Sequence, residues 1–132
     1  MSTNDSKSAS SLIDTSPIVQ YILLRGDLKK SKSYNDGALI AQACHACSAI
    51  LFKTLDDVYT VNYLNDTANM HKIILNVPTE DELIQAHKTL TEGDIQHYLW
   101  LEKPENIKTC IAVKPYVKSD VENYFKQYKL YR

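Results

Sequence analysis

The stretch from Gly37 to Phe52 limits the possible fold of this chain more than any other segment. It reads GALIAQACHACSAILF and is apolar at almost every position, with Gln42, His45 and Ser48 as the exceptions. A helix that is apolar on every side is usually buried, so we expect a buried helix from about Ala38 to about Lys53. Gln42 and His45 are three positions apart and share a face of this helix. A buried polar side chain is costly without a partner, so this small polar face marks a candidate site.

Four short, mainly apolar segments are expected to form strands. They cover Ile18–Leu24, His71–Val77, His97–Leu101 and Thr109–Val113. The first three alternate with helical segments, which implies parallel pairing of these strands with right-handed crossovers. The last two are joined by a short loop and should be antiparallel. The sequence therefore predicts an α/β fold: a mixed four-stranded β-sheet with helices on both faces, in three α/β/α layers.

Three further helical segments complete this prediction. A weak three-residue apolar spacing indicates a short helix near Asp57–Asp66. Thr79 and Glu82 form a capping box that should open the next of these helices. Ser119 and Glu122 form another box, which should open the last helix. The expected apolar stripe of that last helix is Val121, Tyr124, Phe125 and Tyr128.

The length of 132 residues fits one domain. Residues 1–17 are rich in Ser, Thr, Asn and Asp and are expected to be a disordered tail before a folded domain at 18–132. The tail has neither the apolar segment of a secretory signal nor an arginine typical of a transit peptide. No apolar run approaches the roughly 20 residues that span a bilayer. We therefore expect no membrane partner and a cytosolic or nuclear protein, and we adopt the cytoplasmic location.

The cysteines are Cys44, Cys47 and Cys110, an odd set in a chain without a secretion signal. Reduced, buried thiols are the expected state. The segment from Cys44 to Cys47 reads CHAC, which suggests half of a metal site. Zinc needs four ligands, and no second CxxC or paired histidine follows. We therefore expect packed thiols and no metal.

The net charge of −1 gives no overall attraction to nucleic acid. Basic residues nevertheless gather in the segments before and after an acidic middle region, for example at Arg25, Lys29, Lys108 and Lys114. If these segments meet in space, they form a basic face on a neutral protein. Ordinary solvated lysines are the alternative, and charge alone favours that alternative.

The expected topology brings four polar residues to one edge of the sheet. Open α/β sheets bind ligands beyond the carboxyl ends of their parallel strands. Gln42 and His45 lie near the start of the helix that follows the first strand, and Glu102 follows the third strand. Thr109 opens the antiparallel fourth strand at the same edge, and the basic loop 29–32 leaves from it as well. We therefore expect the four residues to converge if the first and third strands are near neighbours.

Each of these residues also has a structural interpretation. His45 is compatible with a core histidine bonded to a backbone carbonyl. Gln42 is compatible with a simple bridge to a loop, and Glu102 with a solvated turn residue paired with Lys103. Thr109 has a high strand propensity and needs no further reason to be where it is.

Several segments, in the same order, resemble one known family. QYILLRGDL, GALIAQACHA, HKIILNVPTEDEL and TCIAVKP are similar to segments of the second, archaeal and eukaryotic class of peptidyl-tRNA hydrolase. HYLWLEKPENIKTCIAVKPY resembles its branch called peptidyl-tRNA hydrolase domain-containing protein. The resemblance runs from about Val19 to the C-terminus. It implies the same mixed sheet with helices on both faces.

The resemblance implies a hydrolase that acts in translation on the ester between a peptide and the 3′ end of tRNA. This reaction needs a positioned water, a base and donors for the carbonyl oxygen, and no cofactor. The family's site residues would fall on Gln42, His45, Thr109 and, in place of an aspartate, Glu102. Helix-start amides and nearby polar residues would bind the tRNA. We expect the latter to be Lys29, Lys30, Lys32, Asn106 and Lys108.

The chain departs from the family pattern at two positions and two loops. Ala38 stands where the family has a lysine, and Glu102 is one methylene longer than the family's aspartate. The loop after Glu102 is shorter, and the longer loop before the helix brings the lysines at 29–32. Two hypotheses follow: a working hydrolase, or a non-catalytic module that binds RNA or a protein partner. A monomer and a homodimer are both compatible with the sequence.

Overall fold

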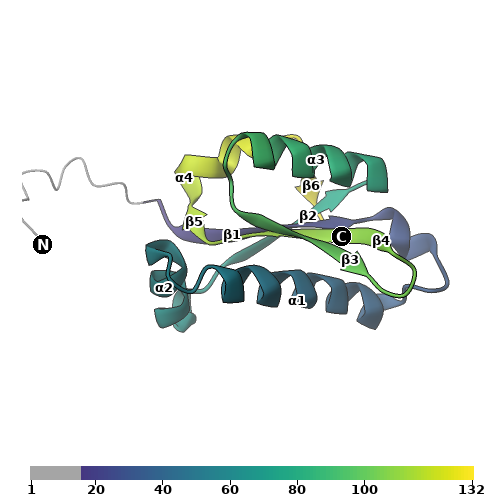
Figure 1. The fold of residues 1–132 in the computed structure, drawn as a ribbon, viewed down its shortest axis with the longest axis horizontal. Coiled ribbons are helices and arrows are strands. Elements are labelled where there is room, and N and C mark those ends of the chain that lie inside the picture. The colour runs from purple at the N-terminus through teal and green to yellow at the C-terminus, as the bar shows by residue number, and fades with distance from the viewer. Residues whose placement is uncertain (1–15) are drawn as a thin grey trace, which may run out of the picture.

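A mixed β-sheet centred on β1 (Ile18–Arg25) separates two helical layers in the computed structural model, which describes residues 16–132 (Figure 1). Residues 1–15 of the expected tail lie outside the described part. The other strands are β2 (Lys72–Val77), β3 (His97–Glu102), β4 (Ile107–Val113), β5 (Tyr116–Val117) and β6 (Lys129–Leu130). The predicted three-layer α/β fold is confirmed, but the sheet has six strands and not four.

The strand order is β3-β4-β1-β2-β6, with β5 paired to β1. β1 and β2 are parallel, whereas β4 is antiparallel to both β1 and β3. β1, β2 and β3 therefore run in the same direction, but the predicted parallel pairing holds only for β1 and β2, because β4 lies between β1 and β3. Almost every residue of β1 is buried, because helices cover both faces of this central strand. The missed strands β5 and β6 have two residues each, which is too short for any periodicity to reveal.

The helices begin at side-chain caps, with one exception. The longer three are α1 (Asp36–Lys53), α2 (Val58–Asn65) and α3 (Glu80–Glu92), and the fourth is α4 (Lys118–Val121). Asn35 Oδ1 accepts a hydrogen bond from the Ala38 amide at 2.9 Å, and Thr79 Oγ1 accepts one from the Glu82 amide at 3.2 Å. Asp57 caps α2 in the same way. No helix among residues 16–132 is both long enough and apolar enough to cross a bilayer.

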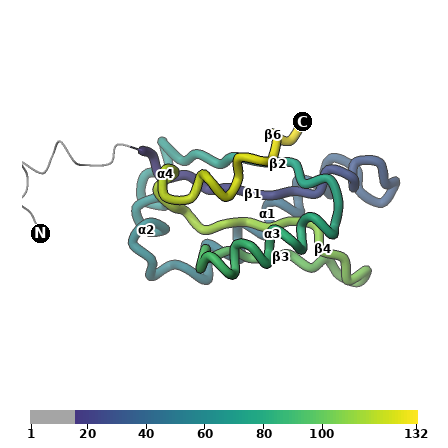
Figure 2. The backbone as a smooth tube through the Cα atoms, turned by 90° about the horizontal axis from the view of Figure 1, so that it is seen from above, coloured from purple at the N-terminus to yellow at the C-terminus, as the bar shows by residue number. Residues whose placement is uncertain are grey.

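The prediction for the last helix was wrong in its length and its cap. α4 is a single turn with Val117 at the cap position, and the 3-10 turn Glu122–Tyr124 follows it. The apolar stripe still packs onto the sheet, since Val121 and Phe125 are buried in the core between the sheet and α3. The chain then has to turn, because β6 pairs antiparallel with β2 at the edge of the sheet (Figure 2). The segment between α4 and β6 is therefore built of short turns and not of a continuous helix.

The prediction that α1 is buried on every side was also wrong. Its inner side packs onto β3 and β4 (Figure 1), but Ile40 is 63% exposed and Phe52 is 75% exposed. The fold has three layers, so no element among the described residues covers the outer side of α1. Cys44 is exposed for the same reason, which contradicts the expectation of three buried thiols. Cys47 and Cys110 are buried, and all three cysteines are free.

Candidate active site

The first turns of α1, the end of β3 and the start of β4 meet at one edge of the sheet. α1 packs mainly on β3 and β4 among the strands. Glu102 is the last residue of β3, and Thr109 lies near the start of β4 after the turn between the two strands. The structure therefore brings the polar face of α1 next to both residues, although β4 rather than β1 is the direct neighbour of β3.

Gln42 and Thr109 form a buried pair beneath this edge. Thr109 Oγ1 donates to Gln42 Oε1 at 2.7 Å, and the two residues are 0% and 1% exposed, respectively. Gln42 Nε2 donates to the carbonyl oxygen of Ala38 at 3.3 Å. Gln42 thus links α1 to β4 rather than to a loop. The pair fixes the orientation of the Gln42 amide.

Glu102 is held at the edge above this pair as a carboxylate. Trp100 Nε1 donates to Glu102 Oε1 at 3.0 Å. This hydrogen bond is the main cause that lowers the pKa of Glu102, and it outweighs the opposing effect of burial. A hydrogen bond from the Gln42 amide and the nearby His45 ring lower the pKa further. Glu102 is therefore ionised at neutral pH. Its partner is not Lys103, whose Nζ donates to Asn106 Oδ1 at 2.7 Å.

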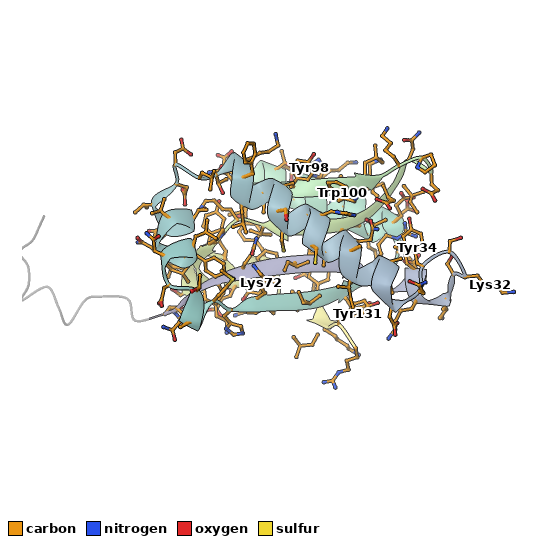
Figure 3. All side chains as sticks on the ribbon, turned by 90° about the horizontal axis from the view of Figure 1, so that it is seen from below. Lys32, Tyr34, Lys72, Tyr98, Trp100 and Tyr131 are labelled. Carbon is orange, nitrogen blue, oxygen red and sulfur yellow. The ribbon has the colours of Figure 1, made fainter. Side chains whose placement is uncertain are left out.

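His45 is exposed and stacks on Trp100, which excludes its interpretation as a core histidine. The two ring centroids are 4.7 Å apart, and the planes differ by 24°. Tyr98 lies next along the same face of β3, 6.1 Å from the Trp100 ring, and Lys53 Nζ lies 5.8 Å from the Tyr98 ring centroid. A row of aromatic rings therefore runs along this flank of α1, starting beside Glu102 (Figure 3).

The five residues expected to bind substrate do not form one cluster. Lys29 faces the other flank of α1, where its Nζ donates to the carbonyl oxygen of Arg132 and lies 5.4 Å from the Tyr131 ring centroid. Lys30 and Lys32 are exposed, and Lys32 projects from the end of the molecule (Figure 3). Asn106 and Lys108 lie in the segment that follows Glu102, nearer to the candidate site.

The backbone around Lys108 is held by two side chains from elsewhere in the chain. Its carbonyl oxygen accepts from Arg25 Nη1 at 3.0 Å, and its amide donates to Glu80 Oε2 at 2.9 Å. Arg25 is itself buried and paired with Asp27 at 2.8 Å. These contacts position the start of β4, and hence Thr109.

Trp100 and Tyr34 lie at the site but were not predicted from the sequence. Trp100 carried a usable signal, since it is two residues before Glu102 on a strand and so shares its face. Tyr34 carried none. Its hydroxyl is buried without a hydrogen-bond partner among the described residues. Burial mainly, and the charges of Glu105 and Glu102, raise the pKa of Tyr34, which keeps this hydroxyl protonated near the site.

The arrangement suits the orientation of a water molecule. An ionised carboxylate at the edge accepts hydrogen bonds only, so it can hold a water through one of its protons. The described residues 16–132 contain no cluster of three or more His, Cys, Asp or Glu that would hold a metal ion. The groups at this edge that can act on a water are Glu102 and the residues that orient it.

Replacing Thr109 with Val is expected to destabilise the fold by about 1–3 kcal/mol. The change is nearly isosteric, but it leaves the buried Gln42 Oε1 without its donor. Urea unfolding measures the loss, and Thr109→Ser, which keeps the hydroxyl, should restore most of it. A Thr109→Val variant as stable as the unmodified protein would show that the pair contributes nothing to the fold.

Comparisons with known proteins identify the family of this chain. The family model described as peptidyl-tRNA hydrolase PTH2 matches residues 18–131. The chain is 43% identical over 127 residues to the Homo sapiens protein named "Putative peptidyl-tRNA hydrolase PTRHD1", covering 96% of this chain and 91% of that protein. It is 31% identical over 101 residues to the peptidyl-tRNA hydrolase of Methanothermobacter thermautotrophicus, covering 73% of this chain and 84% of that protein. The chain therefore belongs to the peptidyl-tRNA hydrolase PTH2 family.

Proposed function

We propose that this protein hydrolyses the ester between a peptide and the 3′ end of tRNA. The observation that carries the proposal is the Glu102 carboxylate, ionised and fixed at the sheet edge by Trp100 and adjoining Gln42 and His45. Family membership and the names of the relatives support the substrate class. A cytoplasmic location is part of the proposal, because tRNA esters are formed and used during translation.

Glu102 acts in this scheme by holding the attacking water. An efficient general base has a pKa near the working pH, whereas the pKa of Glu102 is lowered from 4.5. Its main contribution is therefore the orientation of the water, and an ester is activated enough to react with a well-placed one. Gln42 and Thr109 are buried, so they are positioning residues that keep Glu102 in place. His45 is exposed beside Glu102, and the terminal base at the single-stranded 3′ end of tRNA can stack on its ring.

Two observations favour a second candidate, a module that binds RNA without hydrolysing it. Ala38 supplies no cation at the start of α1, and Lys29 in the preceding loop faces the opposite flank of the helix. Lys30, Lys32 and Lys108 remain available for phosphate contacts. Such contacts release counterions, so tRNA binding should weaken as salt rises, with a logarithmic slope of about −0.7 to −0.9 per phosphate contact.

One assay separates the two candidates. Purified protein is incubated with an N-acetylated aminoacyl-tRNA, and release of the acylated amino acid is followed together with binding of the tRNA. Release above the buffer rate supports the hydrolase. Salt-sensitive binding without release would support the binding module, and the absence of both would contradict both candidates.

A further inference from the structure

An apolar groove lies on the flank of α1 opposite the candidate active site. α1 packs mainly on β3 and β4 and contacts β1 less, so the same face of β2, which carries Lys72 and Ile74, is only partly covered. The resulting groove has a volume of about 550 Å³. Figure 3 shows Lys72 and Tyr131 on this side of α1, and Trp100 and Tyr98 on the other. The walls are mainly hydrocarbon, from Ile22, Leu24, Ile74, Leu39 and Ala43.

One end of the groove has an ammonium group without a carboxylate partner. Lys72 Nζ is held by Gln20 Oε1 and lies 3.5 Å from the hydroxyl of Tyr63. Within residues 16–132, no carboxylate lies within ion-pair distance of Lys72. Burial lowers the pKa of Lys72, and the neighbouring Cys47 and Cys44 only partly oppose this. This end of the groove thus has a positive charge that a ligand anion would neutralise.

The other end has an unsatisfied hydroxyl and a balanced pair of charges. Tyr131 is fixed on this face because its amide donates to the Ile74 carbonyl oxygen at 2.9 Å. Its hydroxyl is buried and has no hydrogen-bond partner among the described residues. Lys29 and Asp36 both line this end, and their opposite charges leave it nearly neutral. Charge complementarity therefore places an anionic group at Lys72 and not at Tyr131.

We propose that this groove binds a single-chain apolar carboxylate, with the carboxylate at Lys72 and the hydrocarbon chain along α1 toward Tyr131. The volume is within the range of small-molecule sites, about 300–1,000 Å³. Between Asp36 and Cys47, α1 provides about 16 Å of wall at about 1.5 Å per residue. This apolar wall fits an extended alkyl chain, and the Lys72 ammonium, which has no carboxylate partner among residues 16–132, fits a monoanion.

Decanoate is the probe for this site, titrated into the full chain by calorimetry. Each methylene removed should weaken binding about three- to fourfold, so octanoate should bind about tenfold more weakly than decanoate. Decanol has the same chain without the charge and should bind at least about tenfold more weakly. Equal affinity for decanol and decanoate would overturn the assignment of Lys72, and no binding of either would overturn the site.

Variants of charged residues on the two flanks of α1 test the assignment further. Lys72→Met should weaken decanoate binding about tenfold and leave decanol binding unchanged, while Lys72→Arg should retain most of the affinity. The matched control is Lys53→Met, because Lys53 lies over Tyr98 on the opposite flank. A loss of decanoate binding in Lys53→Met as large as in Lys72→Met would contradict the proposal.

The exposed thiol in the groove locates the ligand independently. Cys44 lines the groove and is exposed, whereas Cys47 and Cys110 are buried. Bound decanoate should slow the reaction of Cys44 with a maleimide, with the same midpoint as in calorimetry. Calorimetric binding without this protection would place the ligand elsewhere. If a second copy of the chain covers the groove, sedimentation will show a dimer that Ala43→Phe dissociates and decanoate will not bind, which would overturn the proposal.

Discussion

Replacing Glu102 with Gln is expected to lower kcat/KM for peptidyl-tRNA hydrolysis by about 100- to 1,000-fold, which is the typical loss when one preorganised polar group that positions a reacting molecule is removed. Glutamine has the same shape and still accepts a hydrogen bond from Trp100, so the fold should be unchanged. The variant loses only the charge that orders the water. Steady-state release of the acylated amino acid measures the effect, and unchanged thermal unfolding confirms that the fold is intact.

A second variant tests the hydrogen bond from Trp100 that holds the Glu102 carboxylate, without removing its charge. Trp100→Phe keeps the carboxylate but removes the hydrogen bond that lowers its pKa most. The ionised form is needed, so activity falls as pH drops through the pKa of Glu102. In the unmodified protein this acidic limb should lie below pH 4.5, and in Trp100→Phe it should move upward. An active Glu102→Gln variant would contradict the role proposed for Glu102, whatever the result for Trp100→Phe.

The main elements of the fold could be predicted because each has a local signal. β1 is a mainly apolar run, and Thr79 with Glu82 marks the start of α3. The elements that were predicted wrongly or missed depend on contacts with distant parts of the chain. The short β6 exists because β2 offers an unpaired edge, and the helix that begins at α4 ends after a single turn. No local pattern near residue 118 contains that information.

The candidate site could likewise be predicted only where it depends on the order and direction of the strands, and not where it depends on contacts between distant segments. Gln42, Glu102 and Thr109 could be grouped because strand direction alone decides which ends meet at one edge. The direction of Lys29 could not be predicted, since it depends on Tyr131 and Arg132 at the far end of the chain. The exposure of Cys44 was missed because apolar composition alone does not show how many layers cover a helix.

The largest stability effect is expected at Asp57, which partners a buried lysine. Lys114 is 2% exposed, and its Nζ donates to Asp57 Oδ2 at 3.0 Å and to the Pro115 carbonyl oxygen at 2.8 Å. The Tyr116 ring centroid lies 3.6 Å from the same Nζ. Asp57→Ala leaves this ammonium buried without a counter-charge, which costs about 3–5 kcal/mol in comparable pairs. Asp57→Ala also removes the cap of α2, so the loss should lie toward the upper end.

Two control variants and a pH series identify the cause of this loss. Asp57→Asn retains a side-chain oxygen that can accept the cap hydrogen bonds but lacks the charge, so its loss should be smaller than that of Asp57→Ala. Lys114→Met removes the buried charge itself and should cost less than Asp57→Ala. Urea unfolding measures all three, and equal losses in Asp57→Ala and Lys114→Met would contradict the unpaired-charge explanation.

The pH dependence of stability provides the last test of the Asp57–Lys114 pair. Burial by itself raises the pKa of Asp57, but the hydrogen bonds from Lys114 and from the Thr60 and Tyr59 amides outweigh it and hold the pKa below 3.8. Near pH 4 the unfolded chain therefore binds more protons at this carboxyl than the folded protein does. The stabilisation from Asp57 is complete above its unfolded pKa and is lost as pH falls through the lower folded value. Asp57→Asn should show a weaker decline in stability between about pH 5 and pH 2 than the unmodified protein, and parallel declines would exclude Asp57 as the titrating group.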